Sequence, residues 1–270
     1  MKKTAFERVQ TARHPERPYT LDLINKIFED FVEIHGDRRF SDDPALISGF
    51  AKIGGIEVGV VGQQKGRDIN ERRHRNFAMT KPEGYRKALR LMYMAEKFKR
   101  PIVTVIDTPG AYPGIDAEER GQAEAIAFNL REMASLKVPV VVVVLGEGGS
   151  GGALAIGVGD RVLMMENAVY SVITPEGCAA ILWKDAGQAP KAAEGLRLTA
   201  AELSKFGLVD EVIEESDLWT YNQSDGDNQK VFERLKKSIV TNLKELQGLS
   251  VSRLIEGRYE KFRKMGEFQA

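Results

Sequence analysis

The apolar positions of the chain alternate between the spacing of a helix and the continuous runs of a buried strand. Ala88, Leu91, Met92, Ala95 and Phe98 fall on one helical face, which predicts a helix over residues 83–99. Apolar runs predict strands at residues 102–106, 138–145, 161–165 and 169–173, and helices are expected near residues 121–134 and 153–157. Because helices and strands alternate and the strands have no polar side, we expect an α/β fold with both sheet faces covered.

The chain before residue 63 predicts a lead-in, a helix and a hairpin. Pro15 and Pro18 are so close together that residues 1–19 are expected to be extended. After residue 19, one apolar stripe at helical spacing predicts a helix, and it consists of Ile24, Ile27, Phe28, Phe31 and Ile34. Two β-branched runs, near residues 47–53 and 56–61, flank Gly54 and Gly55, and this pattern predicts a hairpin with a tight turn.

The end of the chain predicts a polar loop and two helices. Residues 216–229 are polar and are expected to form a surface loop. In the tail, residues 230–265, a first helix is predicted by apolar residues at helical spacing, namely Val231, Leu235, Ile239, Leu243 and Leu246, and a second helix is predicted near residues 254–262. Each has a single apolar stripe that must pack on the core or on another subunit. We therefore expect a single domain over residues 1–270, with residues 1–40 as lead-in and helix, 41–215 as core and 216–270 as loop and tail helices.

Composition narrows the classes of function. The 270 residues carry 39 basic and 39 acidic side chains, so no overall field favours nucleic acid or an anionic membrane. The single cysteine, Cys178, excludes an intramolecular disulfide, and no metal site is expected on this chain. The longest apolar run, residues 138–145, is too short to span a bilayer, and the N-terminus has no apolar signal segment. These features predict a cytoplasmic protein.

The densest chemical signal is the segment of residues 146–152, which holds five glycines in seven residues after a predicted strand. Gly146, Gly148 and Gly151 match a dinucleotide-binding fingerprint, but the helix predicted after them is shorter than such folds use. Gly148, Ser150 and Gly152 match a nucleophile elbow. That chemistry needs a histidine after the serine, whereas the three histidines of the chain, His14, His35 and His74, all precede it.

Two further interpretations of the same turn remain. Gly151 and Gly152 stand at the start of a predicted helix, where unpaired backbone N–H groups and the helix dipole favour a negative charge. The turn is therefore a candidate oxyanion site, and Gly152→Val is expected to slow the reaction without disturbing assembly. The structural alternative is that the glycines only let helix and strand pack closely.

Neighbouring loops offer secondary candidates. Residues 109–114 supply Gly110 and Ala111 as further backbone donors or as a pocket wall, and Glu176 is a possible base or a helix N-terminal charge. The basic segment at residues 63–67 supplies Lys65 and Arg67, which are candidates for contacts with substrate phosphates or with another subunit.

Several longer segments resemble one family closely, the alpha subunit of the carboxyltransferase of bacterial acetyl-CoA carboxylase. They are Arg75-Asn76-Phe77, residues 14–22, 64–67, 82–88, 107–114, 118–122, 146–157 and 171–178. The resemblance covers about residues 11–215. It implies a crotonase-like fold of repeated β-β-α units. Alternatives are another crotonase-type CoA enzyme, such as a hydratase or decarboxylase subunit, or a dinucleotide-binding module.

The resemblance also implies a reaction and partners. Members pair with a zinc-ribbon beta subunit as α2β2, and they work with biotin carboxylase and biotin carboxyl carrier protein. The carboxyl group moves from carboxybiotin on the carrier protein to acetyl-CoA, which gives malonyl-CoA, the first committed step of fatty acid biosynthesis. Zinc is expected only on the beta subunit, and biotin is not attached to this chain.

The resemblance assigns roles within the glycine turn. The N–H groups of Gly151, Gly152 and Ala153 would stabilise charge on the biotin ureido oxygen. Gly148, Gly149 and Ser150 would line the carboxybiotin pocket, with Gly110 and Ala111 as secondary donors or wall.

Two departures from the family pattern stand out. The long N-terminal helical extension of some members is not in this sequence. In addition, residues 215–220 replace the common Pro-Leu-Gly-Gly-Ala-His segment, so the resemblance does not define the cleft wall at this place.

Overall fold

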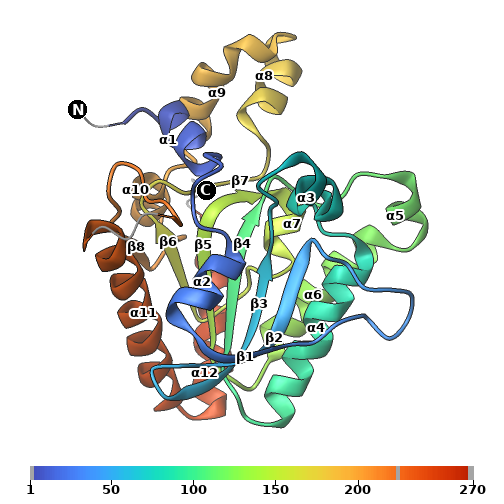
Figure 1. Cartoon of the computed structure of the whole chain (residues 1–270), viewed down its shortest axis with the longest axis vertical. Coiled ribbons are helices and arrows are strands. Elements are labelled where there is room, and N and C mark those ends of the chain that lie inside the picture. The colour runs from blue at the N-terminus through green and yellow to red at the C-terminus, as the bar shows by residue number, and fades with distance from the viewer. Residues whose placement is uncertain (1–2, 223–225, 267–270) are drawn as a thin grey trace.

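A mostly parallel sheet of eight strands organises the chain (Figure 1). The computed structural model describes residues 3–222 and 226–266. The strands are β1 Glu29–Glu33, β2 Leu46–Ile53, β3 Ile56–Gln63, β4 Ile102–Thr108, β5 Val140–Gly149, β6 Arg161–Met165, β7 Val169–Ser171 and β8 Glu211–Ile213. Their order is β1-β2-β3-β4-β5-β6-β8, with β7 paired to the end of β5. The first two pairings are antiparallel and all others are parallel.

Helices connect and cover these strands. They are α1 Ala5–Ala12, α2 Thr20–Ile27, α3 Ile69–His74, α4 Pro82–Lys97, α5 Ile115–Glu119, α6 Gln122–Ser135, α7 Ser150–Leu154, α8 Pro175–Trp183, α9 Ala189–Leu196, α10 Ala200–Lys205, α11 Gly226–Gln247 and α12 Val251–Arg263, with short 3-10 turns at Asn76–Ala78 and Ala186–Gln188. Helix α4 packs on β2, β3 and α6, while α11 packs on β5, β8 and α2. All seven residues of β4 are buried, so the centre of the sheet is covered on both faces, as expected.

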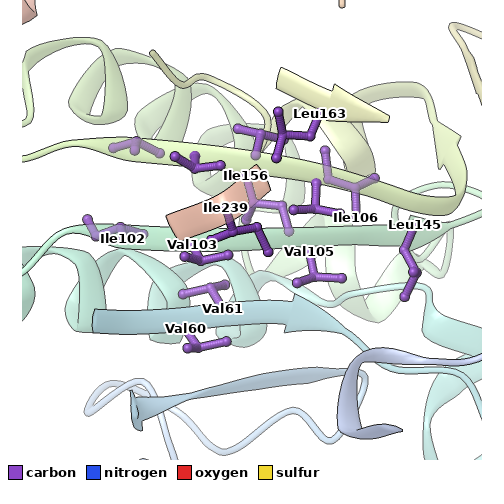
Figure 2. Close-up of a cluster of buried hydrophobic side chains, with 14 of the residues drawn as sticks. Val60, Val61, Ile102, Val103, Val105, Ile106, Leu145, Ile156, Leu163 and Ile239 are labelled. Carbon is purple, nitrogen blue, oxygen red and sulfur yellow. The ribbon is translucent and has the colours of Figure 1, made fainter. Parts of the chain in front are cut away.

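Branched aliphatic side chains fill the core. Figure 2 shows Val60 and Val61 of β3 beside Val103 and Val105 of β4, with Ile239 of α11 reaching the same cluster. These side chains are almost fully buried, so they supply most of the apolar area that stabilises the sheet.

The predicted hairpin and the alternation after residue 83 are confirmed. Strands β2 and β3 pair antiparallel from Ile53 opposite Ile56, and Gly54 and Gly55 have φ of +54° and +80°. The apolar stripe predicted for the first tail helix is confirmed as well, because α11 buries these side chains against the core rather than presenting them to another subunit. Of the predicted loop at residues 216–229, positions 223–225 lie outside the described residues, and α11 already begins at Gly226.

Two expectations near the N-terminus are wrong. Residues 5–12 form α1 instead of an extended lead-in, because Thr4 and Glu7 make a reciprocal capping box at its start. The second helix ends at Ile27, so Phe31 and Ile34 do not continue its stripe. The chain there forms β1, in which Val32 pairs with Phe50 of β2.

Strand β5 is longer than predicted. Its first half pairs with β6, and Glu147–Gly149 then pair with Val169–Ser171 of β7. Three of the five clustered glycines are therefore strand residues, and the chain turns only at Gly149–Ser150.

The end of α4 yields a stability prediction. Lys99 follows the helix with φ +55° and is exposed, and the N–H of Arg100 bonds back to the carbonyl of Ala95. Because a side chain disfavours this left-handed conformation, Lys99→Gly should raise the free energy of unfolding by about 1 kcal/mol. Urea denaturation measures it.

Lys97, two residues earlier in the helix and also exposed, is the matched control. Lys97 is the last residue of α4, and Lys97→Gly should lower stability by about 0.5 kcal/mol, since glycine has a lower helix propensity than lysine. Equal effects of the two substitutions would contradict the assignment of the helix end.

Candidate active site

The glycine turn joins β5 to α7 with no intervening loop. Ser150, the first residue of α7, is exposed and has φ +52°, which reverses the chain direction within one residue. No side chain caps α7. The backbone N–H groups of its first turn, which include those of Gly151, Gly152 and Ala153, have no acceptor inside the helix.

Two of the glycines are required by packing. A Cβ placed on Gly149 would lie 2.1 Å from the carbonyl oxygen of Pro109, and one on Gly152 would lie 2.5 Å from the nitrogen of Ala111. These distances are far below van der Waals contact and involve backbone, which cannot move aside cheaply. The structural explanation of the glycines therefore holds for Gly149 and Gly152. Gly152→Val would push this backbone apart, so it cannot separate a chemical role of Gly152 from its packing, and its effect on assembly stays a prediction.

Gly148 and Gly151 differ from each other in their surroundings. A Cβ on Gly148 would lie 2.7 Å from the ring of Tyr170 on β7, and Gly148 lines the small hollow beside the turn. A Cβ on Gly151 would meet only the side chain of Ile126, at 3.7 Å. Packing leaves Gly151 room for a side chain, which makes it the position that separates a chemical role from a structural one.

The loop after β4 offers one backbone donor rather than two. The N–H of Gly110 already donates to Oγ1 of Thr108 at 3.1 Å, and that hydroxyl also lies 2.7 Å from the carbonyl of Ala78. The N–H of Gly110 is therefore not a free donor, and its place in the pocket wall stays a prediction. Ala111, whose nitrogen lies against Gly152, remains the candidate donor of this loop.

Beneath the turn lies a buried group of charges that the sequence did not single out. Nζ of Lys65 lies 2.6 Å from Oδ1 of Asp107 and 3.2 Å from Oε2 of Glu147. The backbone N–H of Glu147 also donates to Asp107 at 2.9 Å. Burial opposes the charge of Lys65, but the two carboxylates outweigh it and raise the pKa of Lys65. Burial raises the pKa of Asp107 despite the lysine beside it.

Lys65 is thus an internal ion-pair partner. Arg67 is engaged in the same way, because its guanidinium pairs with Asp22 and lies over the rings of Tyr19 and Tyr221 at 4.4 and 3.3 Å. This pairing does not favour contacts of either side chain with substrate phosphates, and their contacts with phosphates or with another subunit stay predictions.

The charge group continues to the surface through Arg13. Arg13 lies 2.6 Å from Glu147 and 2.7 Å from Glu176, which stands in the first turn of α8. Burial raises the pKa of Glu176, but its hydrogen bonds with Arg13 prevail and lower it, which makes Glu176 a weak base. The role of Glu176 as a helix N-terminal charge fits this geometry better than general-base catalysis does.

The strand-end loops meet at one hollow beside the turn. Pro109, Gly149 and Thr174 line it, together with Arg13 and Glu147. Its volume is about 20 Å³, room for about one water molecule. A ligand of several atoms at the turn must therefore lie on the open side of α7, where Ser150 and Gly151 are accessible.

Residues 215–220, which differ from the family pattern, anchor the chain to the sheet instead of forming the wall of a cleft. Glu215 is buried and pairs with Arg17 at 2.5 Å, and Arg17 also donates to the carbonyl of Leu145 at 2.8 Å. Trp219 is fully buried, with the guanidinium of Arg17 5.6 Å from the centre of its ring. The segment thus ties the chain to β5 just before the glycine turn.

The described residues contain neither a cluster of metal-ligating side chains nor a helix that could span a membrane. Within residues 3–222 and 226–266, no three His, Cys, Asp or Glu side chains cluster as a metal site. In the same residues, no helix is long and apolar enough to cross a membrane.

Comparison with known proteins identifies the family. The model for acetyl co-enzyme A carboxylase carboxyltransferase-like proteins matches residues 1–266. The chain is 58% identical over 263 residues to the acetyl-coenzyme A carboxylase carboxyl transferase subunit alpha of Geobacter metallireducens, which covers 97% of this chain and 81% of that protein. The chain belongs to the alpha-subunit family of acetyl-CoA carboxylase carboxyltransferases. The corresponding Pseudomonas aeruginosa subunit is 55% identical, over 97% of this chain and 82% of that protein.

Solved structures support the fold. Transcarboxylase 12S, with methylmalonyl-coenzyme A and methylmalonic acid bound, has a TM-score of 0.68 at 19% identity, over 97% of this chain and 45% of that chain. A Pseudomonas malonate decarboxylase hetero-tetramer in complex with coenzyme A has a TM-score of 0.65 at 17% identity, over 82% of this chain and 86% of that chain. The alpha-subunit family thus has the crotonase-like fold that the resemblance implied, and the dinucleotide and hydrolase interpretations fall away.

The buried charges yield a stability prediction. Lys65→Met would leave Asp107 and Glu147 without their common cation, so the free energy of unfolding should fall by about 3 kcal/mol. Lys52→Met is the control, because Lys52 pairs with Asp30 on the surface, where such a pair contributes little to stability. Similar losses in urea denaturation would show that the buried charges do not hold the turn.

Proposed function

We propose that this chain, together with a beta subunit, transfers the carboxyl group of carboxybiotin on the carrier protein to acetyl-CoA and so forms malonyl-CoA. Membership of the family makes the reaction biotin-dependent and makes the chain one subunit of a complex. The site contribution that we assign to this chain is a backbone oxyanion site on the biotin side, formed by the N–H groups of Gly151, Gly152 and Ala153.

The observation that carries this proposal is the uncapped start of α7 beside an open Gly151. An acceptor oxygen approaching Gly151 meets no side chain of that residue, and Ile126 is the nearest neighbour of its Cβ position. Helix N–H groups that lack partners are strong donors to a negative oxygen. Each preorganised donor of this kind is worth about 3 kcal/mol in a transition state.

The turn suits a biotin ureido group, whose single exposed oxygen needs only closely spaced donors. When bound, carboxybiotin supplies the carboxyl group that is transferred. Gly151, Gly152 and Ala153 would hold the ureido oxygen, Ala111 would add a donor from the facing loop, and Ser150 would stand at the rim. The nearby side-chain charges are already paired among themselves, so backbone dipoles provide the stabilisation.

The surface next to the turn suits a partner subunit. Helix α8 starts at the loop that lines the same hollow, and Figure 1 shows α8 and α9 projecting at one end of the molecule. Ile181 and Leu182 on α8 are 71% and 63% exposed, and Val172 just before it is 76% exposed. A cluster of large apolar side chains in water marks an interface. We assign it to the beta subunit, which would then cover the open side of the turn and bring the acetyl-CoA.

Substitution at Gly151 tests the oxyanion site. Gly151→Val should lower the rate of malonyl-CoA formation by the assembled enzyme about 100-fold or more, because the side chain would occupy the approach to the donors. Gly257→Val is the control, since a Cβ at this exposed α12 glycine meets nothing within 4 Å. Both variants should fold and bind the beta subunit. Wild-type transfer by the Gly151 variant would overturn the assignment.

Substitution on α8 tests the partner surface. Leu182→Glu should abolish co-elution with the beta subunit in size-exclusion chromatography while leaving the fold of the alpha subunit unchanged by circular dichroism. Leu249→Glu is the control, because Leu249 is also exposed but lies between α11 and α12, and α12 is at the opposite end of the molecule from α8 (Figure 1). Normal assembly of the Leu182 variant would place the interface elsewhere.

A further inference from the structure

Helix α7 lacks one of its own hydrogen bonds. The N–H of Ala155 bonds to the carbonyl of Gly151 in the α-helical pattern, at 3.0 Å. The next N–H, that of Ile156, bonds instead to Ala153 at 3.3 Å, three residues back. The helix therefore tightens at its end, and the N–H of Ile156 does not donate a hydrogen bond to the carbonyl of Gly152.

A side chain from strand β3 donates to the carbonyl of Gly152 in place of the missing helix bond. Nε2 of Gln63, at the end of β3, donates to the carbonyl oxygen of Gly152 at 2.8 Å. The side chain of Gln63 is fully buried, so water does not compete for this carbonyl. A buried bond of this kind is costly to leave unmade.

Gln63 is itself fixed at two further points. Its Oε1 accepts the backbone N–H of Asp107 at 3.1 Å, and its own carbonyl accepts the hydroxyl of Thr20 at 2.5 Å. Because one amide atom faces an N–H and the other a carbonyl, only one orientation of the amide satisfies both. Gln63 thus links β3, the end of β4 and the first turn of α7 in one defined geometry.

The carbonyl of Gly152 and the N–H of Ala153 belong to the same planar peptide group. A bond to that carbonyl fixes the plane, and hence the direction of the Ala153 N–H. It also polarises the peptide, which strengthens the N–H as a donor. An effect on the Ala153 donor therefore follows without any contact between Gln63 and the substrate.

We propose that Gln63 is a positioning residue for carboxyl transfer, which orients and polarises the Gly152–Ala153 peptide so that the Ala153 N–H is a strong oxyanion donor. This inference rests on the proposed oxyanion role of the turn. It adds to that role a residue that lies below the turn and acts only through the backbone.

The first test compares two adjacent glutamines in the assembled alpha–beta enzyme. Gln63→Met removes both amide bonds at nearly constant length, and should lower kcat about 10-fold or more with KM for the carboxybiotin carrier within about twofold. Gln64→Met is the control. Gln64 is also buried and also makes two bonds, to the N–H of Leu21 and the carbonyl of Lys65, but none to the turn. It should lose stability with kcat within about twofold of wild type.

The second test uses Gln63→Glu, which keeps an acceptor for Asp107 but can donate to Gly152 only when its carboxyl is protonated. Burial raises the pKa of such a carboxyl, so kcat of this variant relative to wild type should rise as pH falls. The charged neighbours Lys65, Asp107 and Glu147 are present in both proteins, so a protonation step seen only in the variant belongs to the introduced carboxyl.

The outcomes separate this inference from the proposed function. If Gly151→Val slows transfer while Gln63→Met and Gln63→Glu leave kcat and its pH profile unchanged, the positioning role of Gln63 is overturned and the oxyanion site stands. If neither Gly151→Val nor the Gln63 variants slow transfer, the oxyanion site itself fails. If Gln63→Met does not fold, the pH profile of Gln63→Glu decides alone.

Discussion

The glycine turn between β5 and α7 touches the loop after β4 backbone to backbone, and the site depends on that contact. The turn at Gly149 and Gly152 lies so close to Pro109–Ala111 that no side chain fits between them. Such an approach brings the donors of α7 and the N–H of Ala111 to one place, on the carboxyl ends of adjacent parallel strands. The glycines are therefore needed first for geometry, and their chemistry follows from it.

Polar groups below the turn hold this contact in register. Lys65 joins the ends of β4 and β5 through Asp107 and Glu147, while Gln63 joins the end of β4 to α7. Asp107, Glu147 and Gln63 are buried and Lys65 is nearly so, so each must be paired, and the pairing specifies one arrangement of the turn and the facing loop. The surface above remains open, and the exposed apolar side chains of α8 lie on the side where a second subunit would complete the site.

Local patterns predicted the elements whose signals are local. The β2–β3 hairpin follows from Gly54-Gly55 between two β-branched runs, and the alternating elements after residue 83 follow from their apolar runs. Phe31 and Ile34 were misassigned because their spacing also fits a helix. Their strand conformation depends on pairing with β2, a segment farther along the chain that the local spacing does not report. Thr4 and Glu7 have the spacing of a capping box, which is a local signal for α1 that the prolines after it obscure.

The site was predicted in outline and not in detail for the same reason. The density of glycines located the turn, and the resemblance gave the family, which the comparisons confirm. The sequence alone could not show that Gly149 and Gly152 face another backbone, or that Lys65 meets carboxylates from two other strands. Polar residues at the ends of apolar strands, as at Gln63, Asp107 and Glu147, are the sequence signal for the polar groups below the turn.

The most direct test of the account is a crystal structure of the chain with its beta subunit and a biotin analogue. The account predicts the ureido oxygen within about 3 Å of at least two of the backbone nitrogens of Gly151, Gly152 and Ala153, with α8 covered by the beta subunit. A ureido oxygen bound only by side chains, or by the beta subunit alone, would contradict it.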